Sequence, residues 1–331
     1  MIFSGIATVI VKSQGRELKP AALLLIQAFV SSISFIIIAA AMGDFLEMFK
    51  INWIALLPLV VAALFGIVLG NFMYFTSLQL IGVSKAYPIA MTYPLLTYIF
   101  EVIFFPDTNF ITLKLVGILV VIIGVIFISL SHVNNPIEET PIEEISNDDQ
   151  ENTNNFSLLI VKDLDAENEL SGVKIDRMSI KENLKRKMIF GIILSALAAV
   201  TWASGTILIK FGLQNTDVDV IPINAARMFF LIPVSIPIFF LMNKGENKSK
   251  FTWKSVSLVA IASLLTLVAS NILYLLAIDL IGASTPAAIA ASGPLVATPL
   301  SILFLKEKVD WKIILGTLFT IGGIIMVIFL G

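Results

Sequence analysis

Residues 71–95 read NFMYFTSLQLIGVSKAYPIAMTYPL, and residues 271–295 read NILYLLAIDLIGASTPAAIAASGPL. The two stretches align without a gap at a constant offset of 200 residues. Any two membrane helices share apolar residues, but here asparagine, tyrosine, glycine, serine and proline also stay in register. The identical pairs are Asn71/Asn271, Tyr74/Tyr274, Leu80/Leu280, Ile81/Ile281, Gly82/Gly282, Ser84/Ser284, Ile89/Ile289, Ala90/Ala290, Pro94/Pro294 and Leu95/Leu295. We therefore interpret the chain as an internal duplication, which has to be recognised before a fold is assigned.

The composition is that of a membrane protein. Of the 331 residues, 57% are hydrophobic and 14% are charged, and the mean hydropathy is +0.94. A soluble domain carries about 25% charged residues. Several apolar runs approach the ~20 residues with which a helix crosses a bilayer, and they do not alternate as the strands of a membrane barrel do. The sequence predicts an all-α polytopic protein of the cell membrane with about ten transmembrane helices.

The residue types exclude several kinds of chemistry. The chain has no cysteine and a single histidine, His132, so disulfides, thiolate nucleophiles and histidine metal clusters are excluded. No cluster of His, Asp, Glu or Ser–Lys side chains lies within the apolar runs, and we expect no catalytic residue, no enzyme activity, no cofactor and no metal. The net charge of −2 leaves no basic footprint for nucleic acid.

The apolar runs form two groups of five, which suggests two repeats, residues 1–131 and 188–331. Residues 1–11 make only half a span, whereas their counterpart runs from Met188 to Ile209, so the first helix is expected to be truncated. The remaining expected spans of the first repeat are residues 21–42, 53–80, 83–105 and 111–130. Those of the second repeat are residues 188–212, 218–242, 255–281, 283–305 and 311–330.

Residues 132–187 form a polar segment between the repeats. Within residues 133–187 there are 13 acidic and 7 basic side chains. Such a composition is typical of disordered chain, and we expect an acidic linker that is a candidate for binding a protein partner.

An odd number of spans in each repeat places the two copies in opposite orientations. Repeats related in this way occur in secondary transporters, with the substrate near mid-membrane at the repeat interface. Exchange of the two packings between the repeats would then open the site to alternate sides.

Several motifs carry a resemblance to a known family. They are an aromatic and small-residue segment with a turn at residues 74–84 and 274–284, Pro94-Leu95 and Pro294-Leu295 in the fourth and ninth spans, Leu305-Lys306-Glu307 after the ninth, Gly316 in the tenth, Trp202 and Arg227. In these residues the chain resembles the drug/metabolite transporter superfamily, specifically its two-repeat EamA-type members. The resemblance implies a secondary active transporter that moves a small metabolite or a drug-like solute.

The candidate substrate-binding residues are polar or aromatic residues inside the spans. Asn71 and Tyr74 share a helix face, as do Asn271 and Tyr274. Asparagines in this setting either bond neighbouring helices together or form a polar cavity wall, and the sequence leaves both interpretations open. For the aromatic and hydroxyl residues, plain packing is the alternative. The full set is Asn71, Tyr74, Tyr87, Tyr93, Trp202, Ser204, Thr206, Asn271 and Tyr274.

Charged residues and prolines within the spans suggest further roles. Glu101 is a candidate for proton coupling, with snorkelling to the surface as the alternative. Arg227 is a candidate anion contact, with contact to lipid headgroups as the alternative. Lys210 is expected to snorkel. Prolines remove backbone hydrogen bonds, so the fourth and ninth spans are expected to bend and to act as gates at Pro88, Pro94, Pro286, Pro294 and Pro299.

The distribution of positive charge and the family resemblance disagree about orientation. Most Lys and Arg residues fall in loops on the linker side, whereas Lys50, Lys114 and Lys210 fall on the other. The positive-inside rule then puts the linker in the cytoplasm and both termini outside, whereas the resemblance implies cytoplasmic termini. The expected partners are a small solute and the bilayer, with a homodimer as a candidate assembly. The alternative function is a non-transporting scaffold or sensor that uses the linker to bind a partner.

Overall fold

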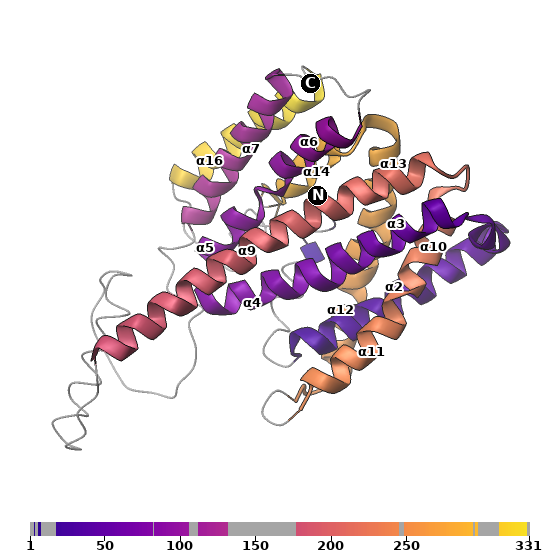
Figure 1. Ribbon diagram of the computed structural model, residues 1–331, viewed down its shortest axis with the longest axis horizontal. Helices are drawn as coiled ribbons and strands as arrows, with labels where there is room; N and C mark the ends of the chain where they lie inside the picture. The colour runs from indigo at the N-terminus through magenta and orange to yellow at the C-terminus, as the bar shows by residue number, and fades with distance from the viewer. Residues whose placement is uncertain are drawn as a thin grey trace.

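The structure is a computed structural model in which the chain folds into a bundle of helices (Figure 1). It describes residues 3, 6–7, 18–81, 83–105, 112–131, 177–244, 248–293, 295–296 and 311–329. Within this part of the chain all regular secondary structure is helical. Seven spans are long and apolar enough to cross a membrane, and Thr112–Ile128 forms a shorter apolar helix. The all-α membrane fold expected from the sequence is confirmed.

The first repeat contains the second to the fifth expected spans. The second span is α2 (Pro20–Met42), the third comprises α3 (Trp53–Ala63), η2 (Leu64–Gly70) and α4 (Asn71–Ile81), the fourth comprises α5 (Val83–Ala90) and α6 (Tyr93–Phe104), and the fifth is α7 (Thr112–Ser131). A short 3-10 helix, η1 (Phe45–Lys50), joins the second span to the third.

The second repeat follows the same plan. The sixth span is α9 (Arg177–Gln214), the seventh comprises α10 (Val220–Phe229) and α11 (Leu231–Met242), the eighth comprises α12 (Trp253–Ser263), η5 (Leu264–Ser270) and α13 (Asn271–Ile281), the ninth begins with α14 (Ser284–Ala291), and the tenth is α16 (Trp311–Phe329). Most of the expected first span and the later part of the ninth, with Pro294 and Pro299, lie outside the described residues.

The start of α9 differs from the sequence-based expectation. We expected residues 132–187 to be disordered, but residues 177–187 are the first turns of α9. Hydropathy located only the apolar part of this helix, because residues 181–187 carry five charged side chains in KENLKRK. The remainder of the expected linker, residues 132–176, lies outside the described part of the chain.

The helix starts use the same device in both repeats. The Asn52 side chain accepts a hydrogen bond from the Ala55 N–H at 2.9 Å and caps α3. Thr252, at the equivalent position, accepts one from the Ser255 N–H and caps α12. Such caps satisfy backbone donors that a helix start leaves unpaired. The duplication therefore extends to local structure that apolar pattern alone does not reveal.

Helices α7 and α16 show that the repeats are inverted. They lie side by side in Figure 1. A Cβ atom added to Gly117 would meet the Gly323 carbonyl at 3.0 Å, and one added to Gly124 would meet the Gly316 carbonyl at 2.6 Å. As the numbers rise along α7 they fall along α16, so the helices are antiparallel. Gly117 and Gly124 of the first repeat are equivalent to Gly316 and Gly323 of the second. Exchanging the repeats therefore turns the Gly117–Gly323 contact into the Gly316–Gly124 contact. Glycines permit the close backbone approach.

The other helices interleave the two repeats. Helix α9 packs against α3, α4, α5 and α6 of the first repeat, and α2 packs against α10, α11 and α12 of the second. Side-chain hydroxyls fix these seams. Ser77 donates to the Gly191 carbonyl at 2.7 Å, Ser195 to the Ala86 carbonyl at 2.6 Å, and Ser32 to the Met228 carbonyl at 2.6 Å. The repeat interface therefore runs through the whole bundle.

Both repeats contain a π-helical turn that the sequence did not predict. In the third span it is η2 and in the eighth it is η5, again 200 residues apart. The fourth span is also interrupted, by a turn at residues 91–92, and the ninth is interrupted at residues 292–293. π-turns occur frequently at functional sites, and these interruptions place non-regular backbone inside the bundle, where it is tolerated beside other protein groups.

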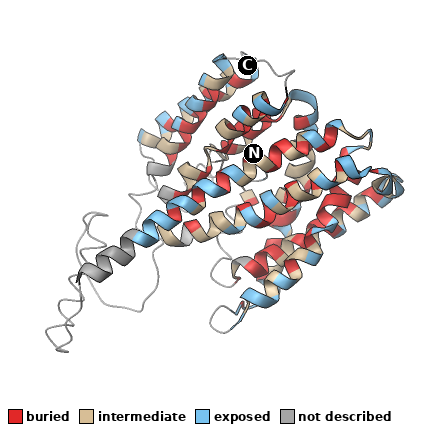
Figure 2. Ribbon diagram, in the orientation of Figure 1, coloured by how far each residue is buried: buried red, intermediate tan, exposed pale blue. Residues whose placement is uncertain are grey.

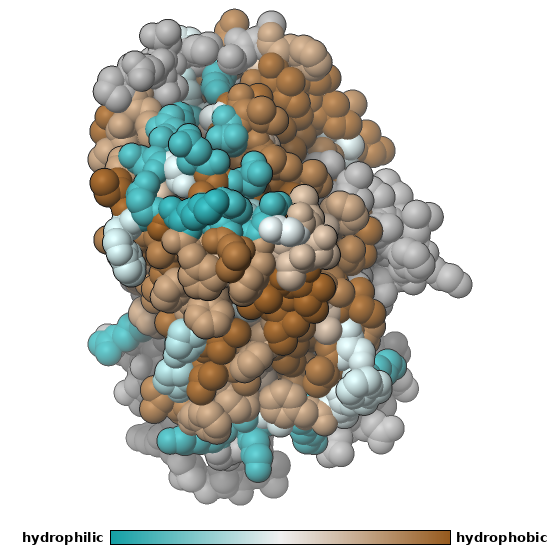
Figure 3. Space-filling view, turned by 90° about the vertical axis from the view of Figure 1, so that its right-hand side faces the viewer, coloured by the Kyte–Doolittle hydropathy of each residue, from teal (hydrophilic) through white to brown (hydrophobic). Residues whose placement is uncertain are grey.

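The outer surface fits a membrane environment. Buried residues lie on the helix sides that face one another, and exposed residues lie on the outside (Figure 2). Many of the exposed side chains are large and apolar, including Phe240, Leu280 and Phe329. Seen from the right-hand side of Figure 1, hydrophilic residues gather within a mainly hydrophobic surface (Figure 3). Trp53 and Trp253 begin equivalent spans and are both exposed, as interfacial anchors are.

Candidate functional site

One face of α9 connects most of the candidate residues. Trp202, Thr206 and Lys210 are spaced four residues apart, so they share a face and extend over about 12 Å of the helix axis. Each contacts residues from other spans. Three levels follow from this spacing: an aromatic level at Trp202, a hydroxyl level at Thr206 and an ionic level at Lys210.

The aromatic level brings together three tyrosines of the first repeat. The Trp202 ring lies 5.3 Å from that of Tyr74 and 5.8 Å from that of Tyr93, and the rings of Tyr74 and Tyr87 are 6.5 Å apart. These separations are typical of favourable aromatic pairs. A Cβ atom on Gly70 would meet the Trp202 Nε1 at 2.5 Å, so a glycine there makes room for the indole.

The indole is also held by the π-helical turn. Trp202 Nε1 donates a hydrogen bond to the Gly66 carbonyl in η2 at 3.1 Å. A π-turn leaves backbone groups outside the normal helical pattern, and here one of them accepts a bond from the aromatic level. The position of Trp202 therefore depends on the irregular backbone of the third span.

The hydroxyl level joins α9 to the eighth span. The hydroxyl groups of Thr206 and Tyr274 are 3.0 Å apart. The Tyr93 hydroxyl donates to the Ala287 carbonyl at 3.0 Å and also interacts with the Tyr274 hydroxyl. This level thus links α6 of the first repeat with α9, α13 and α14 of the second.

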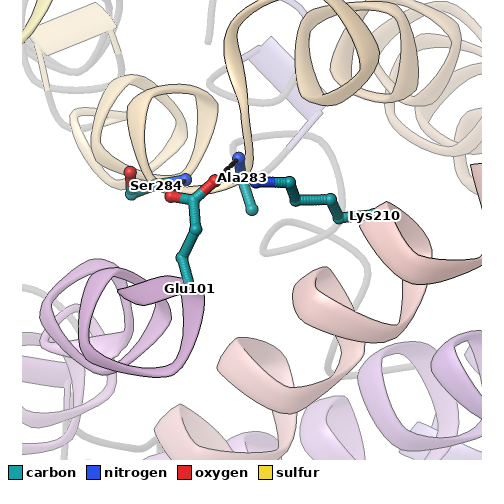
Figure 4. Close-up of polar contacts among 4 residues, drawn as sticks. All are labelled: Glu101, Lys210, Ala283 and Ser284. Carbon is teal, nitrogen blue, oxygen red and sulfur yellow. Dashed lines mark hydrogen bonds and ion pairs between the residues drawn. The ribbon is translucent and has the colours of Figure 1, made fainter. Parts of the chain in front are cut away.

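The ionic level is a buried carboxylate with three donors. Glu101 Oε1 accepts from Lys210 Nζ at 2.8 Å and from the Ala283 N–H at 2.6 Å, and Oε2 accepts from the Ser284 N–H at 3.0 Å (Figure 4). The two backbone donors belong to the start of α14, where the helix dipole favours a negative charge. Lys210 Nζ also lies 4.3 Å from the centroid of the Phe105 ring. The carboxylate therefore ties α6 to α9 and α14.

Gly282 makes room for the Glu101 carboxylate. Its φ of +82° and ψ of 179° lie in a region that essentially only glycine adopts. A Cβ atom at this position would meet Glu101 Oε1 at 2.6 Å. Both the backbone conformation and the close approach require glycine between α13 and α14.

Arg227 contrasts with Glu101 because its charge is unpaired. It is 2% exposed and lies in the last turn of α10, and its Nε and Nη1 atoms have no hydrogen-bond partner among the described residues. The Oδ1 atoms of Asn224 and Asn271 are likewise buried without partners there. Tyr274 lies within electrostatic reach of Arg227. Buried polar groups are normally paired. Asn224 is three residues before Arg227 on α10 and shares its helix face, so two polar groups that lack partners in the described chain lie together on this helix.

Some predicted residues lie apart from this column. Asn71 lines a hollow between α2, η2, α4 and α11 together with Gln27, and no hydrogen bond joins it to another helix within the described residues. Ser204 is two residues from Trp202, and such a pair does not share a helix face. Pro88 lies inside α5, Pro94 in the first turn of α6 and Pro286 in α14.

The interpretation of Lys210 was wrong. We expected it to snorkel to the surface, but it turns inward to Glu101, because a buried carboxylate offers its charge a stronger partner than the interface does. The sequence could not have paired these residues, which are 109 positions apart. Gly282 was recognised only as a repeated glycine. Its partner Glu101 belongs to the other repeat, so the alignment of the repeats gave no signal of the contact.

The described residues contain no group of three side chains suited to a metal ion. What the arrangement provides is a column of aromatic, hydroxyl and ionic groups at the interface of two inverted repeats, a class of architecture found in secondary transporters. The chain belongs to the EamA-like transporter family, which matches residues 1–130 and 189–329. The resemblance noted in the sequence is confirmed, and the protein is a multi-pass membrane protein of a transporter family.

Other comparisons add the fold alone. A solved structure whose title reads "Crystal structure of protein" matches 99% of this chain and 94% of its own, with a TM-score of 0.69 and 14% sequence identity. At this identity the likeness establishes the fold and nothing of the substrate. Among curated proteins, none matches the sequence significantly.

Proposed function

We propose that this protein is a secondary active transporter of the cell membrane that moves a small metabolite or a drug-like solute by alternating access. The observation that carries the proposal is the column on α9, which lies between inverted repeats and joins both of them at every level. Its aromatic and hydroxyl groups could contact a small solute. No nucleotide-binding motif occurs in the sequence, so a gradient would supply the energy.

The ionic level acts as a gate in this proposal. Glu101 joins α6 to α9 and to the start of α14, so the two repeats cannot separate at this end while its three hydrogen bonds persist. The helix interruptions at residues 91–92 and 292–293 allow α5 and α14 to move relative to the chain that follows them. Release of Glu101 would open this end of the column.

Glu101 is also the candidate for proton coupling. A carboxylate accepts from all three of its donors, whereas a protonated carboxyl group loses the charge that Lys210 balances. The neighbouring ionisable groups are Lys210, Lys114 and Tyr274. Protonation of Glu101 would therefore weaken the three hydrogen bonds that close the gate. The unbalanced positive charge of Lys210 would then favour release of the proton. Opening of the gate would in this way be coupled to the movement of a proton.

The absence of cysteine permits a clean accessibility test. Thr206→Cys would place a single thiol in the column, and Ser204→Cys would place one on another face of the same helix. In proteoliposomes we expect a membrane-impermeant thiol reagent to label the Thr206→Cys variant at different rates from the two sides, more slowly from the side that the gate closes. Adding Glu101→Gln should raise the rate from the side that the gate closes, and should leave the labelling of the Ser204→Cys variant unchanged. Labelling rates at position 206 that do not respond to Glu101→Gln would contradict the gate.

Ligand-induced stabilisation would locate the substrate site. A solute that binds the native protein raises its thermal stability, so purified wild type can be tested against amino acids, amines, sugars and nucleotides. A hit that Tyr274→Phe abolishes, while Asn71→Ala retains it, would place the site in the column, and a loss in Asn271→Ala as well would extend the site to that buried amide. A hit that all three variants retain would place it elsewhere. Retained partner binding with no solute flux would favour the scaffold alternative.

A further inference from the structure

The unpaired guanidinium of Arg227 is the starting observation. It lies seven residues after the start of its span at Val220, about 10 Å along the helix axis. It is 2% exposed, and Nε and Nη1 have no hydrogen-bond partner within the described chain. This position also argues against the alternative of a headgroup contact, because the side chain is enclosed by protein. A buried charge without a partner carries a large desolvation cost.

Nearby groups offset this cost only in part. Arg227 is in the last turn of α10, where the helix dipole favours a cation. Tyr274 lies within electrostatic reach and already shares a hydrogen bond with Thr206. Glu101, the buried carboxylate at the ionic level, is held by Lys210 and by two backbone donors. Glu101 is therefore already occupied and does not act as a counter-ion of Arg227 in this conformation.

We propose that Arg227 binds the carboxylate of the transported solute, which is a monoanion with a flat, largely apolar body. This inference rests on the proposed transport function. A guanidinium matches a carboxylate because its planar N–H groups can form parallel hydrogen bonds. A single charge selects a monoanion, since a phosphate dianion would call for further cations. Tyr274, the residue within electrostatic reach of Arg227, belongs to the hydroxyl level through Thr206. The rings of Trp202, Tyr74 and Tyr93 lie at the next level along α9 and would contact the apolar body.

Acid and amide pairs of the same shape test the charge directly. The probes are benzoate, phenylacetate and indole-3-acetate, each compared with benzamide, phenylacetamide and indole-3-acetamide. The readout is the melting temperature of purified wild type in detergent. We expect at least one acid to raise it in a saturable way and its amide to have no effect at the same concentration. Equal stabilisation by acid and amide, or no effect of any acid, would overturn the proposal.

Variants then assign the effect to Arg227. Arg227→Gln should abolish the shift, and Arg227→Lys should weaken it at least tenfold in apparent affinity, because an ammonium keeps the charge but loses the planar geometry. Arg186→Gln removes an exposed arginine from the start of α9 and serves as the matched control, with the shift unchanged. An acid shift that survives in Arg227→Gln would overturn the assignment.

This experiment separates the two proposals. Binding in detergent requires no transport, so an acid that binds through Arg227 but is not carried across proteoliposomes would leave the anion site intact and contradict the transport function. A neutral solute that is transported while no acid binds would do the reverse.

Discussion

Among the described residues, the two fully buried charged side chains have opposite surroundings. Glu101 accepts three hydrogen bonds, from Lys210 and from two backbone N–H groups. Arg227 is equally buried, but two of its nitrogens have no partner among the described residues. Both side chains are at most 2% exposed, so the difference does not come from depth in the protein. The comparison shows that a paired buried charge holds the two repeats together, whereas an unpaired one is available to bind a ligand of opposite charge.

The largest effect should come from removing one partner of the paired charge. Glu101→Gln leaves Lys210 buried beside an uncharged group, and breaking a buried ion pair costs about 3–5 kcal/mol. Thermal unfolding in detergent measures the loss. Glu47→Gln is the control, since it breaks the exposed Glu47–Lys50 pair and should change stability by less than about 1 kcal/mol. Similar losses in the two variants would show that Glu101 is not a buried tie.

Gly282→Ala tests the same contact without changing any charge. The added Cβ atom would lie 2.6 Å from Glu101 Oε1 and would force a backbone conformation that costs about 1–3 kcal/mol. Gly43→Ala is the control for a positive φ alone, because Gly43 has a φ of +84° with a ψ of 2° in the left-handed helical region and no atom within 4 Å of the added group. We expect Gly282→Ala to lower the melting temperature further than Gly43→Ala, because both its ψ of 179° and the contact with Glu101 oppose a side chain. Equal shifts would mean that neither the space around Glu101 nor the extended ψ is limiting.

Arg227→Met should change stability in the opposite direction. It removes an unpaired buried charge and keeps an unbranched side chain, so ligand-free protein should gain about 1 kcal/mol. The measurement is the melting temperature without ligand, compared with Lys254→Met at the exposed start of α12. A loss of stability in Arg227→Met would show that the guanidinium has a structural partner, and the contrast with Glu101 would disappear.

The smallest effect concerns the aromatic level, which carries no charge. Trp202→Phe keeps an aromatic ring but removes the N–H that donates to the Gly66 carbonyl. Hydrogen bonds between membrane helices average about 0.6 kcal/mol, so the melting temperature should fall only slightly. Trp311→Phe, on an exposed ring, is the control. A loss as large as that of Glu101→Gln would make the aromatic level, and not the ion pair, the main tie.

The sequence predicted what is local or repeated and missed what is long-range. The repeat, the span positions and the interruption near Pro94 follow from apolar runs and residue types. Glu101 could be recognised as a candidate because a carboxylate is rare inside an apolar run. Its partner Lys210 could not, because their contact depends on how α6 and α9 pack. The unpaired state of Arg227 was equally invisible, since pairing is a property of the folded neighbourhood.

The charged start of α9 shows a different limit. Apolar pattern locates helix inside a membrane, but residues 177–187 continue the helix with charged side chains. Helix propensity of lysine and glutamate is high, yet the acidic composition of the preceding residues extends the predicted linker over residues 177–187. The average composition of residues 132–187 therefore hides the beginning of a helix at Arg177.

The two π-helical turns bear on the ancestry of the chain. A π-turn holds one residue more than the α-helix around it, and η2 and η5 occupy equivalent positions with no shift in the 200-residue offset. The extra residue was therefore present in the half-length ancestor before it was copied. The copies have since diverged at this point: in one, the Gly66 carbonyl receives the indole N–H of Trp202, and in the other Thr266 bonds back to Ala262. Within the described residues, the same irregularity therefore binds an indole N–H in the first half and is flanked by a threonine-to-backbone bond in the second.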